Sequence, residues 1–336
     1  MRRREMSDSR QAALQQWLNQ LFTPPVEGVD LIFGDASHRR YFRFLHRGES
    51  YIAVDAPPEL EDSTPFLTMT EAYERAGLPV PRVIAADLDL GFMCQSDLGD
   101  THLQGRLSAD SLSLWYGRAL ALLPRIARVT TRAGQSLPPY DEGFLRQELA
   151  LLPEWFHGAH LGREEAQLQP WWPALCDRLV ATALEQPQVG VHRDFHCRNL
   201  MVNGDALAVI DYQGALLGPV TYDPVSLLKD CYVKWSWDSL EPLLRTHFQR
   251  LLELGVIPAD TGWQRFLRWY HLTGLQRHLK VLGIFARLSH RDGKHHYLTD
   301  LPRVLEYVIE AAGLYPETAP LASAALEWRQ QLEERR

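Results

Sequence analysis

Residues 189–211 constrain the fold of this chain more than any other segment. An apolar run ends in the tripeptide His-Arg-Asp at 192–194, and Asn199 follows five residues after the aspartate. Two further apolar runs then flank Asn203-Gly204, and the second of them ends at an acid, Asp211. Because an Asn-Gly pair between apolar runs favours a type I′ turn, we predict a β-hairpin that ends in polar residues.

The polar residues of this segment suit phosphoryl transfer from a nucleotide. An aspartate in this position can accept or orient the proton of an attacking hydroxyl, so we predict Asp194 as the catalytic residue. Asparagine and aspartate supply the oxygen ligands that Mg²⁺ on ATP prefers, so we predict Asn199 and Asp211 as metal ligands. His192 and Arg193 complete the predicted catalytic loop. The alternative interpretation is an ordinary hairpin with polar ends.

A zinc site competes for two histidines of the same segment. His192 and His196 are four residues apart, as zinc-binding histidines on a helix can be. The residues between them include no glutamate that could act as a general base, and the flanking pattern is that of a strand and a loop. Zinc is therefore disfavoured, and we expect both histidines to brace the loop through hydrogen bonds.

The rest of the chain separates into a β-rich part and a helical part. Helical spacing of apolar residues predicts a first helix over 8–22, and Pro65 and Gly77 bound a second one. Aromatic and β-branched runs between turns predict five strands, at 29–33, 41–45, 51–55, 83–86 and 91–95. Further helices are predicted at 108–130, 144–156, 171–185, 224–237 and 263–288. The sequence thus predicts an α+β chain with a β-rich domain over 1–98 and a helical domain over 99–336.

Composition limits the partners and the compartment. Thirty-five Lys and Arg against 42 Asp and Glu give a net charge of −7, so the chain has no overall attraction for nucleic acid. No apolar run is long enough to span a membrane, and none follows the basic N-terminus as it would in a signal peptide. The four cysteines form no C-x-x-C motif and indicate free thiols in a reducing compartment. We expect a cytoplasmic monomer that binds a small molecule, and neither nucleic acid nor a membrane.

Residues 194–211 resemble the catalytic and metal-binding core of the aminoglycoside phosphotransferase and choline kinase superfamily. The resemblance implies a protein-kinase-like α+β fold of two lobes, with ATP and Mg²⁺ as cofactors. It also implies that adenine binds against the linker between the lobes, near Gln95, Asp97 and Leu98. Asp223-Pro224 is similar to an Asp-Pro pair of the superfamily, although helix capping, with Asp223 as the N-cap, explains most of that pair.

Four separated stretches resemble one branch of this superfamily in particular: residues 34–43, 54–58, 97–100 and 276–294. Together they are similar to a branch of bacterial kinases that phosphorylate the anomeric hydroxyl of N-acetylmuramate and N-acetylglucosamine in cell-wall recycling. The branch implies an amino-sugar acceptor. Kinases of another small alcohol, such as an aminoglycoside, homoserine or choline, are the alternative enzymes. A nucleotide-binding pseudokinase is the alternative from another class, and the complete catalytic and metal-binding set speaks against it.

The nucleotide-binding part departs from the general kinase pattern. The loop after the first strand should be rich in glycine, yet it offers Gly34 followed by small residues such as Ser37. The third strand normally carries a lysine that binds phosphates, and here Asp55 occupies that position. We predict that a nearby arginine supplies the missing charge, the alternative being a solvated basic turn. The candidates are Arg39, Arg40 and Arg43.

The acceptor side has weaker sequence features. Glu148 and Trp155 share one predicted helix, and an aromatic face can stack on a sugar, although a tryptophan at helical spacing is more often core. Gln213, two residues after Asp211, is a third candidate. Arg277 is the fourth, and it opens a basic cluster that either meets an anionic acceptor or forms a solvated helix face. The other members of that cluster are His278, Arg287, Arg291 and Lys294.

Overall fold

The computed structural model describes residues 2–34 and 39–335, so the predicted nucleotide-binding residue Ser37 lies outside the described residues. The chain divides into two compact units. The first comprises the chain up to His102, Thr131–Gln135 and Leu200–Gly214, and the second comprises Leu103–Thr130, Ser136–Asn199 and the chain from Ala215 onward. The division into domains over 1–98 and 99–336 stays a prediction.

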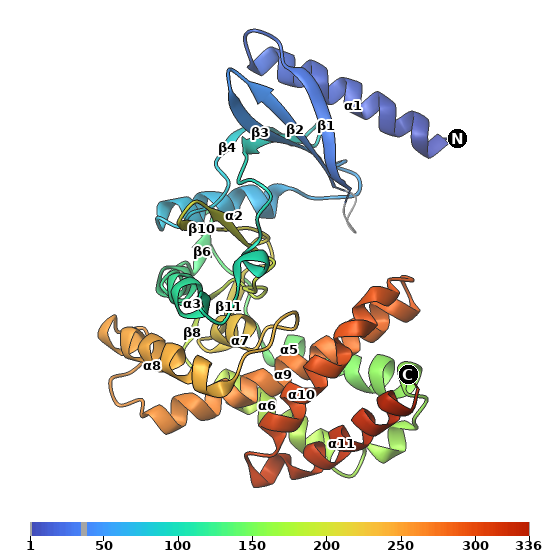
Figure 1. The fold of residues 1–336 in the computed structure, drawn as a ribbon, viewed down its shortest axis with the longest axis vertical. Coiled ribbons are helices and arrows are strands. Elements are labelled where there is room, and N and C mark those ends of the chain that lie inside the picture. Colours follow the sequence, from blue (N-terminus) through green and yellow to red (C-terminus); the bar gives the residue numbers. More distant parts are fainter. Residues whose placement is uncertain (1, 35–38, 336) are drawn as a thin grey trace. The chain divides into compact units, whose positions relative to one another are not determined.

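The first unit is built on a five-stranded antiparallel sheet. Its strand order is β1 (Glu27–Gly34), β2 (Arg40–His46), β3 (Glu49–Asp55), β5 (Phe92–Ser96) and β4 (Val83–Asp87). Side chains alternate between the two faces of a strand, and Phe42 and Phe44 of β2 pack with α1 (Arg2–Leu21) in one apolar core. Figure 1 shows α1 along one face of this sheet. The five strands and the first helix that the sequence predicts are therefore confirmed.

The hairpin predicted around Asn203-Gly204 belongs to the first unit. β9 (Leu200–Asn203) pairs with β10 (Ala206–Val209), which leaves Gly204 and Asp205 in the turn. Of these two residues only Gly204 has a positive φ, at 57°. The type I′ turn is therefore a wrong prediction, because that turn requires a positive φ at both positions.

Helix α2 (Thr64–Arg75) anchors the chain that follows this hairpin. Tyr212 is fully buried, its hydroxyl hydrogen-bonds the Thr70 hydroxyl at 2.7 Å, and its ring stacks on Phe66 with the ring centroids 5.4 Å apart. These contacts fix the backbone next to Asp211. That residue has a φ of 64°, in the left-handed region that non-glycine residues seldom adopt.

The second unit is mainly helical. Its helical elements are η1 (Leu103–Arg106), α3 (Leu112–Leu120), α4 (Leu123–Ala127), α5 (Glu142–Leu149), η2 (Leu152–His160), η3 (Glu165–Gln167), α6 (Trp172–Leu184), α7 (Tyr222–Leu228), α8 (Trp237–Glu253), α9 (Trp263–His290), η4 (His295–Asp300), α10 (Leu301–Ala312), η5 (Pro316–Thr318) and α11 (Ala319–Glu334). The antiparallel strands β8 (Gln188–Val191) and β11 (Leu216–Pro219) also belong to this unit. Of the two remaining short strands, β6 (Thr131–Arg132) belongs to the first unit, and β7 (Gln135–Ser136) has one residue in each unit. Among the described residues, no helix is long and apolar enough to cross a membrane.

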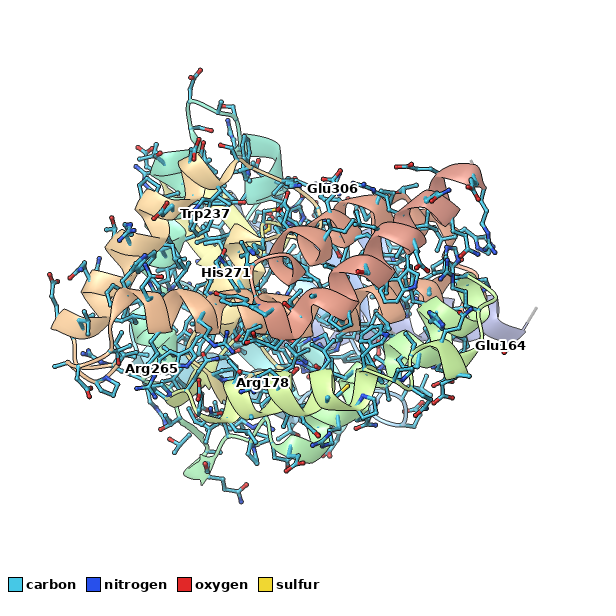
Figure 2. The ribbon with its side chains drawn as sticks, turned by 90° about the horizontal axis from the view of Figure 1, so that it is seen from below. Glu164, Arg178, Trp237, Arg265, His271 and Glu306 are labelled. Atoms are coloured by element: carbon cyan, nitrogen blue, oxygen red, sulfur yellow. The ribbon has the colours of Figure 1, made fainter. Side chains whose placement is uncertain are left out.

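Helix α9 runs through the middle of the second unit. Figure 2 shows α9, labelled at His271, between α6, labelled at Arg178, and α10, labelled at Glu306. Gly283 lets α9 approach the start of η2 closely, because a Cβ at that position would lie 2.5 Å from the Leu151 carbonyl carbon. Most of α9 is thus buried, and other helices of the unit pack against it.

Three predicted helices differ in extent from the structure. The segment 108–130 is not one helix, because it is divided into α3 and α4. The segment 144–156 is not one helix, because α5 ends within it and η2, a π-helical segment, follows. The segment 224–237 is not helical throughout, because α7 ends early. The Asp230 carboxylate then accepts hydrogen bonds from the backbone amides of Cys197 and Tyr232, which takes the chain out of a helical path.

Candidate active site

The loop 192–199, which carries the predicted catalytic aspartate, is anchored to α7. The Asp223 carboxylate accepts hydrogen bonds from the backbone amides of His192 at 2.7 Å and Arg193 at 3.0 Å. Asp223 is buried, so water competes little for these bonds. The predicted capping role of Asp223 is therefore wrong: the N-cap of α7 is Thr221, and Asp223 binds the loop instead.

A second buried aspartate fixes the other end of this loop. Asp230 accepts the Cys197 amide hydrogen at a nitrogen–oxygen distance of 2.8 Å. Within the loop, the side-chain amide of Asn199 donates to the carbonyl oxygen of Asp194 at 2.9 Å. The backbone on both sides of Asp194 is thus held by side chains, as a group that must meet a substrate hydroxyl requires.

The two histidines of the loop pack against aromatic rings. His192 is buried, its ring lies edge-on to Phe195, and its Nδ1 accepts the backbone amide hydrogen of Asp194 at 3.3 Å. The His196 ring lies edge-on to Tyr232 with the centroids 5.2 Å apart. The His192 ring therefore supports the loop backbone through a hydrogen bond, as predicted, whereas His196 contributes a ring contact and its buried Nδ1 has no hydrogen-bond partner among the described residues.

The side chain of Arg193 contacts Glu148 on α5. Its backbone φ is 78°, and its Nη2 donates to Oε1 of Glu148 at 2.5 Å. The ammonium of Lys280 lies 3.3 Å from the same oxygen. Oε2 of Glu148 accepts from the Tyr140 hydroxyl and from the Gln276 side-chain amide. We call these five residues, all in the second unit, the Glu148 cluster.

Charged neighbours set the ionisation of the carboxyls in this region. Burial raises the pKa of Asp194, but the positive charges of Lys280 and Arg277 outweigh burial and hold that pKa below its usual value. Burial also raises the pKa of Glu148, and the charges of Lys280 and Arg193 reverse that shift too. Both carboxyls are therefore ionised at neutral pH.

Asp223 behaves differently from the other two carboxyls. Burial raises its pKa to about 6, although His192 and the two amide hydrogen bonds act in the opposite direction. The nearby charge of Asp194 adds to the increase. The group that anchors the loop thus titrates close to neutral pH, while the predicted catalytic carboxyl does not.

Asp55, at the predicted lysine position, is a fully buried ion-pairing group in the first unit. Arg10 of α1 donates to its Oδ1 through Nε at 2.8 Å and Nη2 at 2.5 Å. Arg40 donates to its Oδ2 through Nε at 3.0 Å and Nη2 at 2.5 Å. Gly34, Arg40 and Asp55 are consecutive partners across β1, β2 and β3. One carboxylate and two guanidinium groups carry a net charge of +1, as one lysine would.

The other two candidate arginines have different surroundings. Arg43 pairs with Asp97, with Nε 2.6 Å from a carboxylate oxygen, and with Asp100, with Nη2 at 2.8 Å. Two carboxylates therefore neutralise its charge. Arg39 is buried beside β2. Of the three candidates, Arg40 is the one that lies opposite the lysine position.

The segment predicted to bind adenine borders a cavity of about 480 Å³ in the first unit. Asp97 and Leu98 line this cavity, together with the start of β3 and residues 202–204. Gln95 is buried, and its side-chain oxygen has no hydrogen-bond partner among the described residues. Asp97 is held in place by the Ser50 hydroxyl at 2.6 Å, so its carboxylate belongs to the framework of the segment.

The predicted metal ligands offer the donor atoms that Mg²⁺ prefers. Asn199 uses its side-chain nitrogen within the loop, so the atom that it can offer a cation is the amide oxygen. Oδ1 of Asp211 accepts a hydrogen bond from the Gln213 side-chain amide at 2.7 Å. Gln213, predicted on the acceptor side, thus supports Asp211. A carboxylate and an amide oxygen fit Mg²⁺, which takes its other ligands from phosphate groups and water.

The remaining predicted acceptor residues do not share one surface. Glu148 is buried within its cluster, and Trp155 is half-buried in η2 and packs against the core of the second unit. Arg277 is buried on α9, where its Nη1 donates to the Cys231 sulfur at 3.1 Å. The solvated helix face is therefore a wrong interpretation for Arg277, whereas Arg291 is exposed.

Sequence reasoning missed Asp230 and Lys280. Asp230 follows α7 by two residues, and nothing in its local sequence points to the loop 192–199. The sequence does contain a pattern that could have identified Lys280: it follows Gln276 by four residues, so the two side chains share one face of the helix. Both residues act over a long sequence separation, which local patterns do not report.

Comparison with known proteins identifies relatives over most of the chain. Residues 29–267 match the phosphotransferase enzyme family. The N-acetylmuramate/N-acetylglucosamine kinase of Pseudomonas aeruginosa is 43% identical over 299 residues, which cover 89% of this chain and 87% of that protein. The protein of the same name from Neisseria meningitidis is 38% identical, with 95% of this chain and 96% of that protein covered.

Solved structures are similar in fold at low sequence identity. A choline/ethanolamine kinase family protein from Mesorhizobium loti gives a TM-score of 0.61 at 15% identity, and the match covers 97% of this chain and 99% of that one. An ADP-bound aminoglycoside phosphotransferase gives 0.60 at 12% identity, with 88% and 97% covered. The predicted protein-kinase-like α+β fold is thereby confirmed.

Proposed function

Because the chain belongs to the phosphotransferase enzyme family, we propose that it is an ATP-dependent kinase of the anomeric hydroxyl of N-acetylmuramate and N-acetylglucosamine. The observation that carries this proposal is the anchored loop: Asp223 and Asp230 fix the backbone on both sides of an ionised Asp194. Relatives that span nearly the whole chain and bear the name of this activity support the choice of acceptor.

Asp194 acts on the acceptor hydroxyl. Its carboxylate accepts the hydrogen bond of the anomeric hydroxyl and orients the oxygen towards the γ-phosphorus. An anomeric hydroxyl is more acidic than an ordinary alcohol, so a carboxylate of low pKa suffices to receive its proton. His192 and Arg193 act as positioning residues, because their backbone amides and side chains hold the loop rather than face a ligand.

Asn199 and Asp211 would hold Mg²⁺ through oxygen atoms. When bound, the ion offsets negative charge on the β- and γ-phosphates and orients them for transfer. The support for Asp211 is its fixed conformation: Gln213 holds one of its carboxylate oxygens, and the buried Tyr212 fixes the adjoining backbone.

Arg40 supplies the phosphate-binding charge in place of the strand lysine. It lies opposite Asp55, and Asp55 also holds Arg10, so the group retains one net positive charge after the carboxylate is counted. Arg43 is a weaker candidate because Asp97 and Asp100 already balance its charge. Adenine binds at the segment that includes Gln95, whose buried side-chain oxygen has no partner among the described residues.

Arg277 provides positive charge towards an acceptor that carries a carboxylate, as N-acetylmuramate does. Its guanidinium is bound to a thiol sulfur rather than to a carboxylate within hydrogen-bond distance, and its charge extends to Asp194. A charge that is not neutralised locally in a buried site acts over a longer range than one in solvent. Trp155 remains the proposed aromatic contact for the sugar.

We place the activity in the cytoplasm, where ATP is available, and expect the protein to act as a monomer. The four cysteines are buried as free thiols, which agrees with a reducing compartment. The β-rich residues 1–98 would then form the nucleotide lobe and residues 99–336 the acceptor lobe.

The test of this function is an acceptor panel with ATP and Mg²⁺. N-acetylmuramate and N-acetylglucosamine should be phosphorylated, whereas an aminoglycoside, homoserine and choline should not. Phosphorylation of one of the latter three with no turnover of the amino sugars would replace the proposed acceptor. Nucleotide binding without turnover of any acceptor would identify a pseudokinase.

A further inference from the structure

We propose that Lys280 is a positioning residue for phosphoryl transfer, which acts on the catalytic loop through Glu148 and Arg193. This inference rests on the proposed kinase activity and adds a helix, α9, to the parts of the molecule that determine its rate. No feature of the H-R-D segment itself points to Lys280, which lies 86 residues after Asp194 in the sequence.

The ammonium of Lys280 has two defined partners inside the second unit. Its Nζ donates to the Tyr222 hydroxyl at 2.8 Å and lies 3.3 Å from Oε1 of Glu148. The side chains of Lys280 and Glu148 are each 6% exposed. An ammonium with so little exposure does not reach a substrate directly, so its effect on the reaction has to pass through its neighbours.

The next contact leads from Glu148 to the catalytic loop. Oε1 of Glu148, the oxygen beside Lys280, also accepts from Nη2 of Arg193 at 2.5 Å. Arg193 immediately precedes Asp194 and has a left-handed backbone, with a φ of 78°. A non-glycine residue in that region is strained, and it persists only where its surroundings hold it. The Glu148 ion pair is one of the contacts that hold it.

Helix α9 binds both oxygens of the Glu148 carboxylate. Lys280 lies beside Oε1, and Gln276, one helical turn earlier, donates to the Tyr140 hydroxyl at 2.9 Å and to Oε2 at 3.4 Å. Residues four apart share a face of a helix, so the two side chains fix the carboxylate as a unit. With the carboxylate fixed, the position of the Arg193 guanidinium is fixed as well.

The charges around Lys280 explain why removal of its ammonium would change the electrostatic environment of Asp194. Arg193, Arg277 and Lys280 contribute three positive charges, and Glu148 and Asp194 contribute two negative ones, which leaves a net charge of +1. Without Lys280, Glu148 keeps a single cationic partner and the net charge falls to zero. Arg193 and Arg277 then face Glu148 and Asp194 with no excess positive charge, and both the loop geometry and the field at the transferring phosphoryl group change.

The experiment measures kcat and KM for wild type, Lys280→Met and Lys280→Arg, with N-acetylglucosamine as acceptor. We expect Lys280→Met to lower kcat by about 10²-fold, because a displacement of about 1 Å at a catalytic group costs about that much. The KM for ATP should change by less than about threefold, since Lys280 contacts no nucleotide-binding residue. Lys280→Arg should recover part of kcat, because it restores the charge.

Lys229→Met is the matched control. Lys229 is as buried as Lys280 and lies in the same unit, but it faces the Tyr270 ring, with Nζ 5.3 Å from the ring centroid. It should keep kcat within about threefold of wild type, because it does not contact the Glu148 cluster. A Lys280→Met enzyme with wild-type kcat, or one no slower than Lys229→Met, would overturn the inference.

A double-mutant cycle tests the route through Glu148. If Lys280 acts through Glu148, the variant with both Glu148→Gln and Lys280→Met should be no slower than the slower single variant. Losses in kcat that multiply would contradict that route. If Lys280→Met does not fold, Tyr222→Phe takes its place, because it removes the hydroxyl that holds the ammonium and little else; wild-type kcat in Tyr222→Phe would then overturn the inference.

Failure of this inference can be told apart from failure of the proposed function. Wild-type enzyme that phosphorylates no amino sugar contradicts the function and, with it, the role of Lys280. Wild-type enzyme that is active, beside a Lys280→Met enzyme that is equally active, contradicts the role of Lys280 alone.

Discussion

Arg40 lies directly opposite Asp55 in the register of β2 and β3, and its guanidinium donates two hydrogen bonds to one oxygen of the buried Asp55 carboxylate. The other oxygen is taken by Arg10 of α1. A position that carries a lysine in other kinases thus carries an acid that holds two arginines. The missing lysine is therefore no argument for loss of catalysis, because one net positive charge stays at this position.

Replacement of Arg40 by alanine should weaken ATP binding by about tenfold or more and leave adenosine binding unchanged, because only ATP carries phosphate charge for the guanidinium to bind. Calorimetric titration with both ligands measures the difference. Arg47→Ala is the matched control, since Arg47 lies in the turn between β2 and β3 and donates to the Thr23 carbonyl instead. Equal weakening of ATP and adenosine would mean that Arg40 supports only the fold.

Asp194→Asn should lower kcat by about 10²-fold or more, because the group that orients the acceptor hydroxyl is lost while the shape of the side chain is kept. ATP binding should survive, since the loop backbone is anchored by Asp223 and Asp230 rather than by Asp194. Steady-state kinetics and calorimetry on the same preparation check both statements. Turnover close to that of wild type would remove Asp194 from the mechanism.

Asp211→Ala should abolish the Mg²⁺ dependence of nucleotide binding and should abolish turnover, because the carboxylate is the stronger of the two proposed metal ligands. ATP titrations with and without Mg²⁺ measure this. Asp205→Ala, which removes a carboxylate from the turn of the same hairpin, should retain the dependence. Unchanged Mg²⁺ dependence in Asp211→Ala would contradict the proposed ligand.

Activity should fall as the pH drops through about 6. The pKa of Asp223 is raised to about 6, and protonation weakens the carboxylate as an acceptor for the amides of His192 and Arg193. Stability has the opposite sign: because the folded-state pKa lies above the unfolded one, the folded protein binds more protons, and this group favours folding more as the pH falls from about 6 to about 4.

Asp223→Asn tests whether Asp223 is the group whose protonation lowers the activity. It should lower kcat at pH 7.5 by about tenfold, since an amide offers one acceptor oxygen where the carboxylate offers two. It should also flatten the acidic limb of the pH–kcat profile, because the titrating group is gone. If the acidic limb of the profile is unchanged in Asp223→Asn, a group other than Asp223 causes the loss of activity at low pH.

The sequence predicts the parts of this molecule that depend on local patterns. The hairpin between Leu200 and Val209 has two short apolar strands, each exposed only at its turn end, and a glycine in the turn, and consecutive residues encode both features. The same holds for the strands of the first unit. The exact turn residues escape prediction, because the register depends on which pairs of residues bury best and not on the Asn-Gly pair alone.

Residues that act across the fold escape prediction for a different reason. Asp223 sits next to a proline at the start of a helix, a pattern that fits a cap, and only the folded chain brings its carboxylate to the amides of His192 and Arg193. Arg277 belongs to a basic stretch that is typical of a solvated face, yet α9 is covered by its neighbours. Burial of a whole helix is a tertiary property, which its own composition does not determine.

Reduction of the acceptor tests the central claim most directly. The alditol of N-acetylglucosamine lacks the anomeric hydroxyl and retains the others, so a phosphorus NMR comparison of the two sugars with ATP and Mg²⁺ isolates the reacting oxygen. We predict a single anomeric phosphate on the intact sugar and no phosphate on the alditol. Phosphate on the alditol, or at carbon six of the intact sugar, would contradict the assignment of this protein as an anomeric kinase.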